Sequence, residues 1–320
     1  MKKIAVLGTG SAGIQCLCHL LTWLKNDWEI VSIHNPDIPI IGIGESTNPS
    51  FISAIEYGLG FSMYEALESG DLDATIKLGT LYTDWRTKEF INPLLNAGVA
   101  IHMNTYALKT YAMPRLHNKW KSKFKEILGT VSDIKNNGNH ASLLINNIKY
   151  KFDYIIDCRG FPNSYEEYTV VNNPTNHCLV HNVKNSGNWK STKHIATEDG
   201  WMFGIPLTNR QSYGYLFNNN ITDICTAKTN FSKKIGVPEA ELDNIEYKFQ
   251  SYYCNNMIDG RVIKNGNRAV FFEPMFANSI WLYDQINKYI IDLLNGTYNT
   301  QTLNTAFTVR AKEVEDMICF

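Results

Sequence analysis

The sequence predicts an α/β protein in which a Rossmann-type dinucleotide-binding domain carries an inserted antiparallel β-sheet lobe. Three observations predict this fold. A short apolar stretch at residues 2–7 runs directly into a glycine-rich turn at residues 8–13. A second apolar run at residues 154–157 is typical of another buried parallel strand. Residues 169–217 are rich in strand-forming side chains with Asn and Gly at the turns, as in an antiparallel sheet.

The chain opens with the βαβ unit of a nucleotide-binding domain. After the turn come helical apolar spacing at 14–23 and a second strand at 29–33. The three glycines of the turn allow a tight bend, the approach of the backbone to a pyrophosphate and close helix packing, while the serine orients the phosphate. We therefore expect the turn to bind a dinucleotide through Gly8, Gly10, Ser11, Ala12 and Gly13.

The end of the second strand departs from the usual dinucleotide-binding pattern. That strand normally ends in an acidic residue that binds the ribose hydroxyls, whereas here it runs into Ile33-His34-Asn35. His34 or Asn35 can still hydrogen-bond a ribose. Because the usual carboxylate is missing, we expect the cofactor to bind dissociably.

The remaining elements follow from apolar spacing and turn residues. We expect helices at 50–58, 61–67, 119–128, 239–256 and 279–294, a small β-meander at 130–134, 141–145 and 149–152, and a last parallel strand at 269–272. The domain boundaries that follow are 1–168 for the dinucleotide-binding domain (with the meander near 130–152), 169–261 for the β-rich substrate lobe, and 262–320 for the return to the first domain and a closing helix.

Composition excludes several classes of protein. The chain has 320 residues, and 30 basic against 31 acidic side chains give a net charge of −1, so neither a nucleic-acid nor a membrane surface is expected. No apolar run approaches the roughly 20 residues of a membrane span.

The seven scattered cysteines show no zinc spacing, so no metal site is expected, and their odd number suggests free thiols in the cytoplasm. The eight histidines show no triad or metal spacing and are expected to be surface or satisfied polar residues. We expect a monomer or a homodimer.

Five further segments complete the pattern. They are Gly42-Ile43-Gly44-Glu45-Ser46-Thr47-Asn48-Pro49-Ser50, Ile76-Lys77-Leu78-Gly79 with Asp84-Trp85, Asp157-Cys158-Arg159-Gly160-Phe161, Trp201-Met202-Phe203-Gly204-Ile205-Pro206, and Glu273-Pro274-Met275-Phe276-Ala277-Asn278-Ser279-Ile280. In this order, and over nearly the whole chain, they resemble the signatures of the flavin-dependent halogenases, nearest to the tryptophan halogenase-like group. The resemblance implies an FAD-binding domain of the flavin monooxygenase/halogenase kind.

The resemblance also implies a reaction. In such enzymes reduced FAD, supplied by a separate flavin reductase, reacts with oxygen to give a flavin hydroperoxide, which chloride or bromide attacks. The hypohalous acid then travels to a lysine beside an electron-rich, indole-like aromatic substrate. Lys77 matches that lysine, whose pKa burial can lower towards the task. Position alone favours a surface lysine paired with Asp73 or Asp84, whereas the flanking matches favour the catalytic role.

Other site residues are implied by the same resemblance. The loop of Gly44, Glu45, Ser46 and Thr47 belongs to the flavin side, and Glu45 either lies near the isoalloxazine or caps the helix beginning near Pro49. Trp201 and Phe203, at i and i+2, share one face of a strand and, with Pro206, form a wall between flavin and substrate. The alternative for this pair is ordinary sheet core.

The last segment departs most from the family. The family's catalytic glutamate and serine are replaced here by Phe276 and Ala277. The phenol- and pyrrole-type branches of the family also have Phe at the first of these positions. Phe276 is therefore expected to lie at the substrate. The resemblance also implies that backbone N–H groups of Asn278 and Ser279 hold the halide, and the start of the closing helix favours an anion. Relatives continue beyond the segment that matches the end of this chain, which is thus a fragment or a minimal enzyme with an open pocket.

Two competing functions stay open. A flavin monooxygenase would hydroxylate the substrate, against which Lys77 and Trp201 argue. A flavin-binding homologue that does not halogenate is favoured by His34, Phe276 and Ala277.

Overall fold

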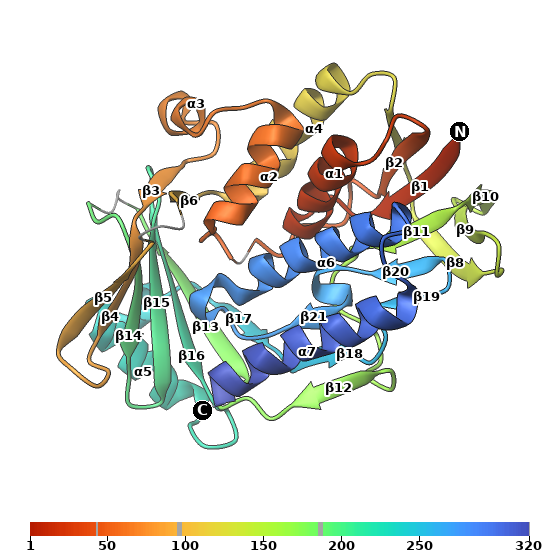
Figure 1. Cartoon of the computed structure of the whole chain (residues 1–320). Helices are drawn as coiled ribbons and strands as arrows, with labels where there is room; N and C mark the ends of the chain where they lie inside the picture. The colour runs from red at the N-terminus through yellow and green to blue at the C-terminus, as the bar shows by residue number, and fades with distance from the viewer. Residues whose placement is uncertain (43, 95–97, 185–187, 320) are drawn as a thin grey trace.

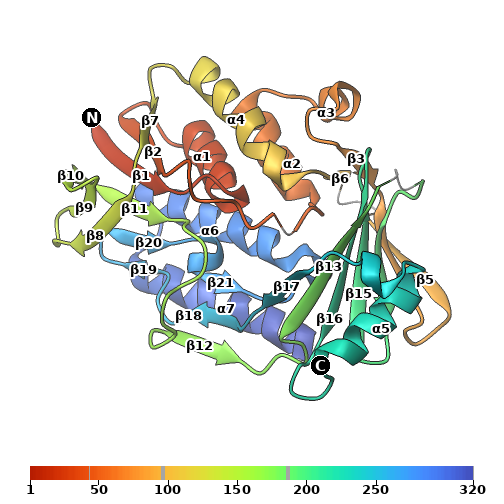
Figure 2. The same ribbon diagram turned by 180° about the vertical axis from the view of Figure 1, so that it is seen from behind.

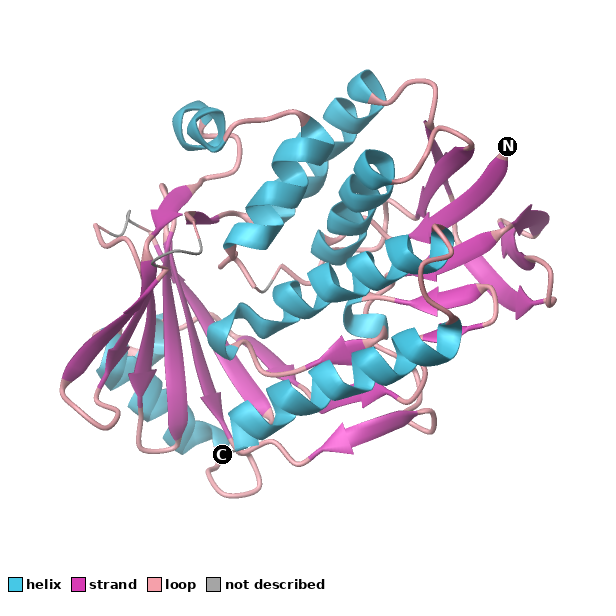
Figure 3. Cartoon of the chain, viewed as in Figure 1, coloured by secondary structure: helices cyan, strands magenta, loops and turns pink. Residues whose placement is uncertain are grey.

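The computed structural model describes residues 1–42, 44–94, 98–184 and 188–319. A mainly parallel sheet lies beneath a group of helices at one end of the molecule, and a tall, mainly antiparallel sheet forms the other end (Figure 1). Figure 3 shows the same division by secondary structure. The predicted α/β fold with an antiparallel lobe is confirmed.

The first sheet is the nucleotide-binding core. Its order is β19-β20-β11-β1-β2-β7, and its strands are parallel except for β19. The strands are β1 (Lys2–Leu7), β2 (Trp28–His34), β7 (Phe124–Leu128), β11 (Tyr154–Asp157), β19 (Ile258–Asp259) and β20 (Val262–Lys264). The four predicted ranges at 2–7, 14–23, 29–33 and 154–157 all fall within elements of the expected type.

Two apolar clusters cover the two faces of this sheet. One joins Ile4, Val6 and Ile30 to the helices α1 (Ser11–Trp23), α2 (Pro49–Leu59), α4 (Thr105–Lys119), α6 (Asn278–Leu294) and α7 (Thr300–Cys319). The other joins Ala5 and Leu7 to the predicted meander of β8 (Val131–Asn136), β9 (Ala141–Ile145) and β10 (Ile148–Phe152), which is seen from behind in Figure 2. A short helix, α3 (Met63–Ser69), follows α2.

The second sheet has seven strands in the order β17-β13-β16-β15-β14-β4-β5. They are β4 (Gly79–Thr83), β5 (Glu89–Pro93), β13 (His177–Val183), β14 (Thr192–Ala196), β15 (Gly200–Pro206), β16 (Gln211–Phe217) and β17 (Ile245–Lys248). Helix α5 (Ile224–Ile235) packs on one face through Phe231. The other face, which carries Trp201 and Phe203, turns towards the nucleotide-binding half.

Smaller elements connect the two halves. Strands β3 (Thr75–Lys77) and β6 (Ala100–His102) form an antiparallel pair. A three-stranded sheet consists of β12 (Tyr168–Val171), β18 (Ser251–Cys254) and β21 (Val270–Phe271). Single 3-10 turns are η1 (Glu239–Glu241), η2 (Gly266–Arg268) and η3 (Met275–Ala277).

Three predicted elements are wrong. Residues 119–128 are not a helix, because helix α4 ends at Lys119 and β7 pairs with β2. Residues 239–256 form one 3-10 turn and two strands. The strand at 270–271 is antiparallel to β18, and the parallel strand of this region is β20. No helix in the part of the chain that the structure describes is long and apolar enough to cross a membrane.

Candidate active site

The glycine turn fits a phosphate group. Gly8 has φ of +93°, and a Cβ on Gly13 would lie 2.0 Å from the Gly8 carbonyl oxygen, so both positions require glycine. Gly10 precedes α1 and has no side chain to cap it, and a Cβ there would meet open space. The first amides of α1, at Ser11 and Ala12, therefore point to a place where an anion can bind.

His34 lies at the expected ribose position. The amide of Gly8 donates to the Ile33 carbonyl (2.9 Å), which ties the turn to the end of β2. His34 is buried, and no described group bonds its Nδ1. Its Nε2 lies 3.7 Å from Glu126 Oε1 on β7, and burial is the largest cause of its lowered pKa. A hydroxyl group of a bound ribose would give this buried, unpartnered ring nitrogen a hydrogen-bond partner.

The predicted flavin-side loop lies along β6. The amide of Met103 donates to the Glu45 carbonyl (2.8 Å), and the amide of Thr47 donates to the Ile101 carbonyl (3.1 Å). Glu45 is buried and pairs with Arg210 of the turn between β15 and β16. Glu45 does not cap α2.

The cap of α2 is the Asn48 side chain, which accepts from the Phe51 amide (2.9 Å). Burial raises the pKa of the Glu45 carboxyl, against the opposing effect of Ser212 and Arg210.

Lys77 is not a surface residue. Only 4% of it is exposed, and Nζ donates to the Thr47 carbonyl (2.9 Å). Asp84 instead pairs with Lys234, and Asp73 accepts from Asn104 (2.9 Å), so the predicted alternative of a surface ion pair is wrong. Burial lowers the pKa of Lys77 to about 8, so both the ammonium and the neutral amine are accessible near that pH.

Two buried histidines flank Lys77, and sequence reasoning missed both. His102 lies on β6 and His194 on β14, and each is at most 2% exposed. Burial, followed by the charge of Lys77, lowers the pKa of each to about 3, so both rings are neutral. A signal for His102 was its place in the apolar segment Val-Ala-Ile-His-Met, whereas the segment of His194, Thr-Lys-His-Ile-Ala, gives little local signal.

Trp201 and Phe203 share a face of β15, as predicted. Their ring centroids are 6.3 Å apart, and both belong to one buried apolar cluster. Trp201 Nε1 donates to Glu273 Oε2 (3.4 Å), and its ring lies 4.9 Å from that of His194. The carbonyl of Pro206, at the end of the strand, accepts from Thr75 Oγ1 (2.6 Å).

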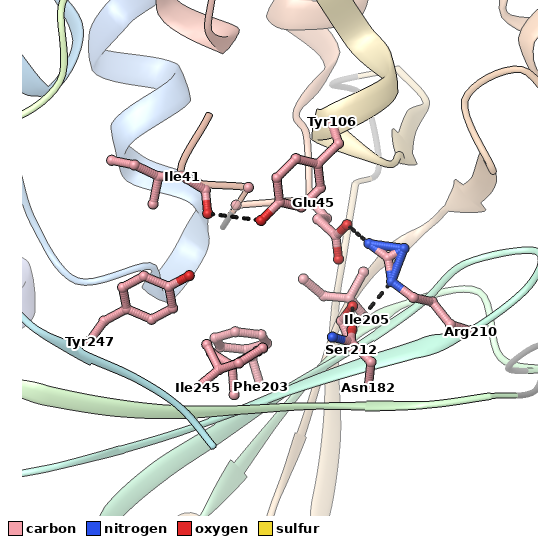
Figure 4. A pocket seen from close by; sticks show the side chains of 13 residues that line it. Ile41, Glu45, Tyr106, Asn182, Phe203, Ile205, Arg210, Ser212, Ile245 and Tyr247 are labelled. Carbon is pink, nitrogen blue, oxygen red and sulfur yellow. Dashed lines mark hydrogen bonds and ion pairs between the residues drawn. The ribbon is translucent and has the colours of Figure 1, made fainter. Parts of the chain in front are cut away.

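A cavity of about 60 Å³ lies between the flavin-side loop and the second sheet (Figure 4). Glu45, Arg210 and Tyr106 border it on one side and Phe203, Ile245 and Tyr247 on another. The full lining is Ile41, Gly42, Gly44, Glu45, Tyr106, Val180, Asn182, Phe203, Ile205, Arg210, Ser212, Ile245 and Tyr247. Lys77 is not in this lining. Phe203, which borders the cavity, lies on the face of the sheet that also carries His194 and Trp201.

The start of α6 fits an anion. Ala277 precedes it with φ of +56° and provides no side-chain cap. Asn278 is buried, and no described group bonds its Nδ2, while Ser279 is half-buried in the first turn. The dipole of a 17-residue helix favours a bound anion at its start. The side chain of Phe276 lies outside the described residues.

Comparisons of the sequence and the fold with known proteins identify the family of this chain. The family described as tryptophan halogenase matches residues 3–141 and 129–320. Tryptophan 6-halogenase ThaL from Streptomyces albogriseolus is 21% identical over 368 residues, covering 88% of this chain and 68% of that protein.

Two solved structures are similar in fold. MibH, a lanthipeptide-type tryptophan 5-halogenase, has a TM-score of 0.84 at 18% identity, covering 98% of this chain and 71% of its own. A tryptophan halogenase from Shewanella frigidimarina has a TM-score of 0.82 at 17% identity, covering 99% and 75%. This chain belongs to the tryptophan halogenase family, a family of flavin-dependent enzymes.

Proposed function

We propose that this protein halogenates an electron-rich, indole-like aromatic substrate through hypohalous acid and Lys77, using FAD reduced by a separate flavin reductase. The observation that carries the proposal is the buried Lys77 amine, which has no carboxylate partner among the described residues and a pKa near 8. The relatives named above act on tryptophan. An indole ring is therefore the substrate class we propose.

The cofactor is proposed to bind across the glycine turn. The backbone at Gly8, Gly10 and Gly13 and the first amides of α1 would hold the pyrophosphate, and His34 would bind the ribose. The loop of Gly44, Glu45, Ser46 and Thr47 would border the flavin ring. When bound, reduced FAD supplies with oxygen the two-electron oxidant that converts halide to hypohalous acid. The division into cofactor segments (1–168 and 262–320) and a substrate lobe (169–261) is part of the proposal.

Halide is proposed to bind at the start of α6. Asn278 and Ser279 are the first residues of α6, and the helix dipole favours an anion there. The side-chain Nδ2 of Asn278 is a further donor that lacks a partner in the described structure. Chloride or bromide would fill this place.

Lys77 is proposed to hold and polarise the halogen donor. Its ammonium already uses one donor on the Thr47 carbonyl, and two donors are left for HO–X. The aromatic carbon then forms a bond to X as the O–X bond breaks, the ring loses its proton, and water is the second product. Burial strengthens the hydrogen bond because the local dielectric is low.

Trp201 and Phe203 are proposed to separate oxidant formation from the substrate. Phe203 lines the cavity beside Glu45, and the Trp201 ring lies against His194 on the side of Lys77. A small acid can pass such a wall, whereas an indole cannot contact the flavin directly. Pro206 and Phe276 would complete the substrate side.

A product assay with reduced FAD, bromide and indole or tryptophan tests the proposal. Brominated product supports it, and hydroxylated product supports a monooxygenase instead. Flavin binding without any product supports a homologue that does not halogenate. Omission of bromide is the control, since only halogenation depends on it.

A further inference from the structure

A chain of buried hydrogen bonds runs beside Lys77. Ser46 Oγ lies 2.8 Å from Thr192 Oγ1, which lies 3.0 Å from His102 Nε2. On the other side of the ring, His102 Nδ1 lies 3.1 Å from Thr75 Oγ1, which donates to the Pro206 carbonyl (2.6 Å). His102 is fully buried, so both ring nitrogens depend on these partners.

The direction of each hydrogen bond follows from the last one. The Pro206 carbonyl can only accept, so the hydroxyl proton of Thr75 is committed to it. His102 Nδ1 must therefore carry a proton and donate to Thr75 Oγ1. In a neutral ring Nε2 is then an acceptor, so Thr192 donates to it and Ser46 donates to Thr192.

This chain of hydrogen bonds links side chains from three parts of the molecule. Ser46 belongs to the flavin-side loop, Thr75 to the strand of Lys77, and Thr192 and Pro206 to the seven-stranded sheet. His102 is the only one of the five that bonds on two sides through a rigid ring. Next to Ser46, Thr47 places its carbonyl on the Lys77 ammonium.

We propose that His102 is a positioning residue for Lys77, which ties the flavin-side loop and strand β3 to the seven-stranded sheet and so holds the Thr47 carbonyl on the Lys77 ammonium. The inference rests on the proposed role of Lys77. The physical reason is that strand β3 has only three residues and the loop has no regular structure apart from an isolated bridge between Ser46 and His102. Backbone hydrogen bonds join both to β6, and the side-chain hydrogen bonds through His102 add a link to Thr192 and Pro206 of the seven-stranded sheet.

The first measurement needs no cofactor. NMR of lysine-labelled protein follows the titration of the Lys77 amine, assigned by the resonance that Lys77→Met removes. His102→Phe removes both ring hydrogen bonds and should lower the Lys77 pKa by at least about 0.5 unit, because the ammonium loses its carbonyl acceptor. His102→Asn keeps a donor towards Thr75 and should restore part of the shift. Both variants keep His194, whose ring also interacts electrostatically with Lys77, so a change in the Lys77 pKa is due to His102.

The second measurement is the partition of oxidant. In His102→Phe the organic product per reduced flavin consumed should fall on the order of tenfold, while hypohalous acid trapped in solution rises. His177→Phe is the matched control, since His177 is a buried histidine of the seven-stranded sheet that stacks on Phe217. It should change neither quantity.

An unchanged Lys77 titration and an unchanged partition in folded His102→Phe would overturn the inference and leave His102 a residue of stability alone. A Lys77→Met variant that still halogenates would overturn the proposed function instead. The NMR titration would then still decide whether His102 positions Lys77.

Discussion

Lys77 lowers the stability of the fold that holds it. Burial moves its pKa from 10.5 to about 8, so at neutral pH the folded state carries a charge that water would solvate better. The shift corresponds to about 3 kcal/mol. Such a residue is not chosen for stability, and active sites are where destabilising groups of this kind are found.

The stability of a Lys77→Met variant tests this conclusion. A lysine with a depressed folded-state pKa destabilises below that pKa, and the penalty disappears as the pH rises from about 8 to 10.5, because the unfolded chain still binds the proton. After loss of one hydrogen bond, Lys77→Met should be more stable at pH 7 by about 2 kcal/mol. Urea unfolding at pH 7 and pH 10 measures the gain, which should shrink at pH 10. Lys121→Met, at an exposed site, is the control. No gain at pH 7 would contradict the burial argument.

The ribose position yields a second prediction at the scale of residues. A carboxylate introduced by His34→Glu should bind ribose hydroxyls, but Glu126 lies 3.7 Å from the present ring and would repel it. The double variant His34→Glu with Glu126→Gln should therefore tighten FAD by about 1 kcal/mol, roughly fivefold in Kd. Flavin fluorescence titration measures this, with Glu126→Gln as the control. If His34→Glu alone lowers the Kd for FAD as much as the double variant does, Glu126 does not repel the introduced carboxylate.

At the scale of elements, strand β16 makes room for the wall. A Cβ on Gly214 would lie 2.2 Å from Cε1 and Cζ of Phe203, so that ring depends on a glycine in the neighbouring strand. Gly214→Ala should push the ring aside and lower the halogenated product per flavin consumed on the order of threefold or more.

The control for that variant is Gly204→Ala, on the opposite face of β15, where the new Cβ would meet Tyr213 at 3.0 Å. It should leave the product ratio near that of the wild type. A folded Gly214→Ala protein with the wild-type ratio would leave Phe203 an ordinary core residue.

The elements that sequence predicted correctly are those with strong local signals. Strand β1 with its glycine turn, and the meander with its Asn-Gly turn, carry both apolar pattern and turn residues. Strand β7 was missed because an edge strand can carry charges such as Lys125 and Glu126. Helix α4 was missed because it holds Pro114 in its interior.

Residues 239–256 show how two periods compete. Pro238 near the start suggested a helix, but Ile245 and Tyr247 alternate with Glu246 and Lys248, which is the period of a strand. Pairing with β13 decides the outcome. Pairing between strands that are distant in sequence is difficult to predict from a short sequence segment.

The candidate site follows the same rule. Motif matches predicted Lys77 and the same-face pair of Trp201 and Phe203, because their spacing is local. His102 and Glu273 were not predicted as site residues, since their partners Thr192 and Thr175 are distant in sequence. Only the folded chain brings such pairs together.

On the scale of the whole molecule, the site lies where the two sheets meet. The glycine turn and the start of α6 belong to the nucleotide-binding half, while the wall belongs to the seven-stranded sheet (Figure 1). Phe203 lines the cavity beside Glu45, whereas Lys77 does not, and the Trp201 ring lies 4.9 Å from that of His194. Under the proposed function, these rings would keep the place where the oxidant forms apart from the place where it is used.

The partition of oxidant in a Lys77→Ala variant tests this division of labour most directly. The measurement compares wild type and variant for FAD binding, bromide-dependent oxidation of reduced flavin, hypobromous acid trapped in solution, and brominated indole. We predict that the variant binds FAD and consumes reduced flavin as the wild type does, releases the oxidant to the trap, and forms no brominated indole beyond what free hypobromous acid yields. Brominated indole at the wild-type rate and yield in Lys77→Ala would contradict the role of Lys77.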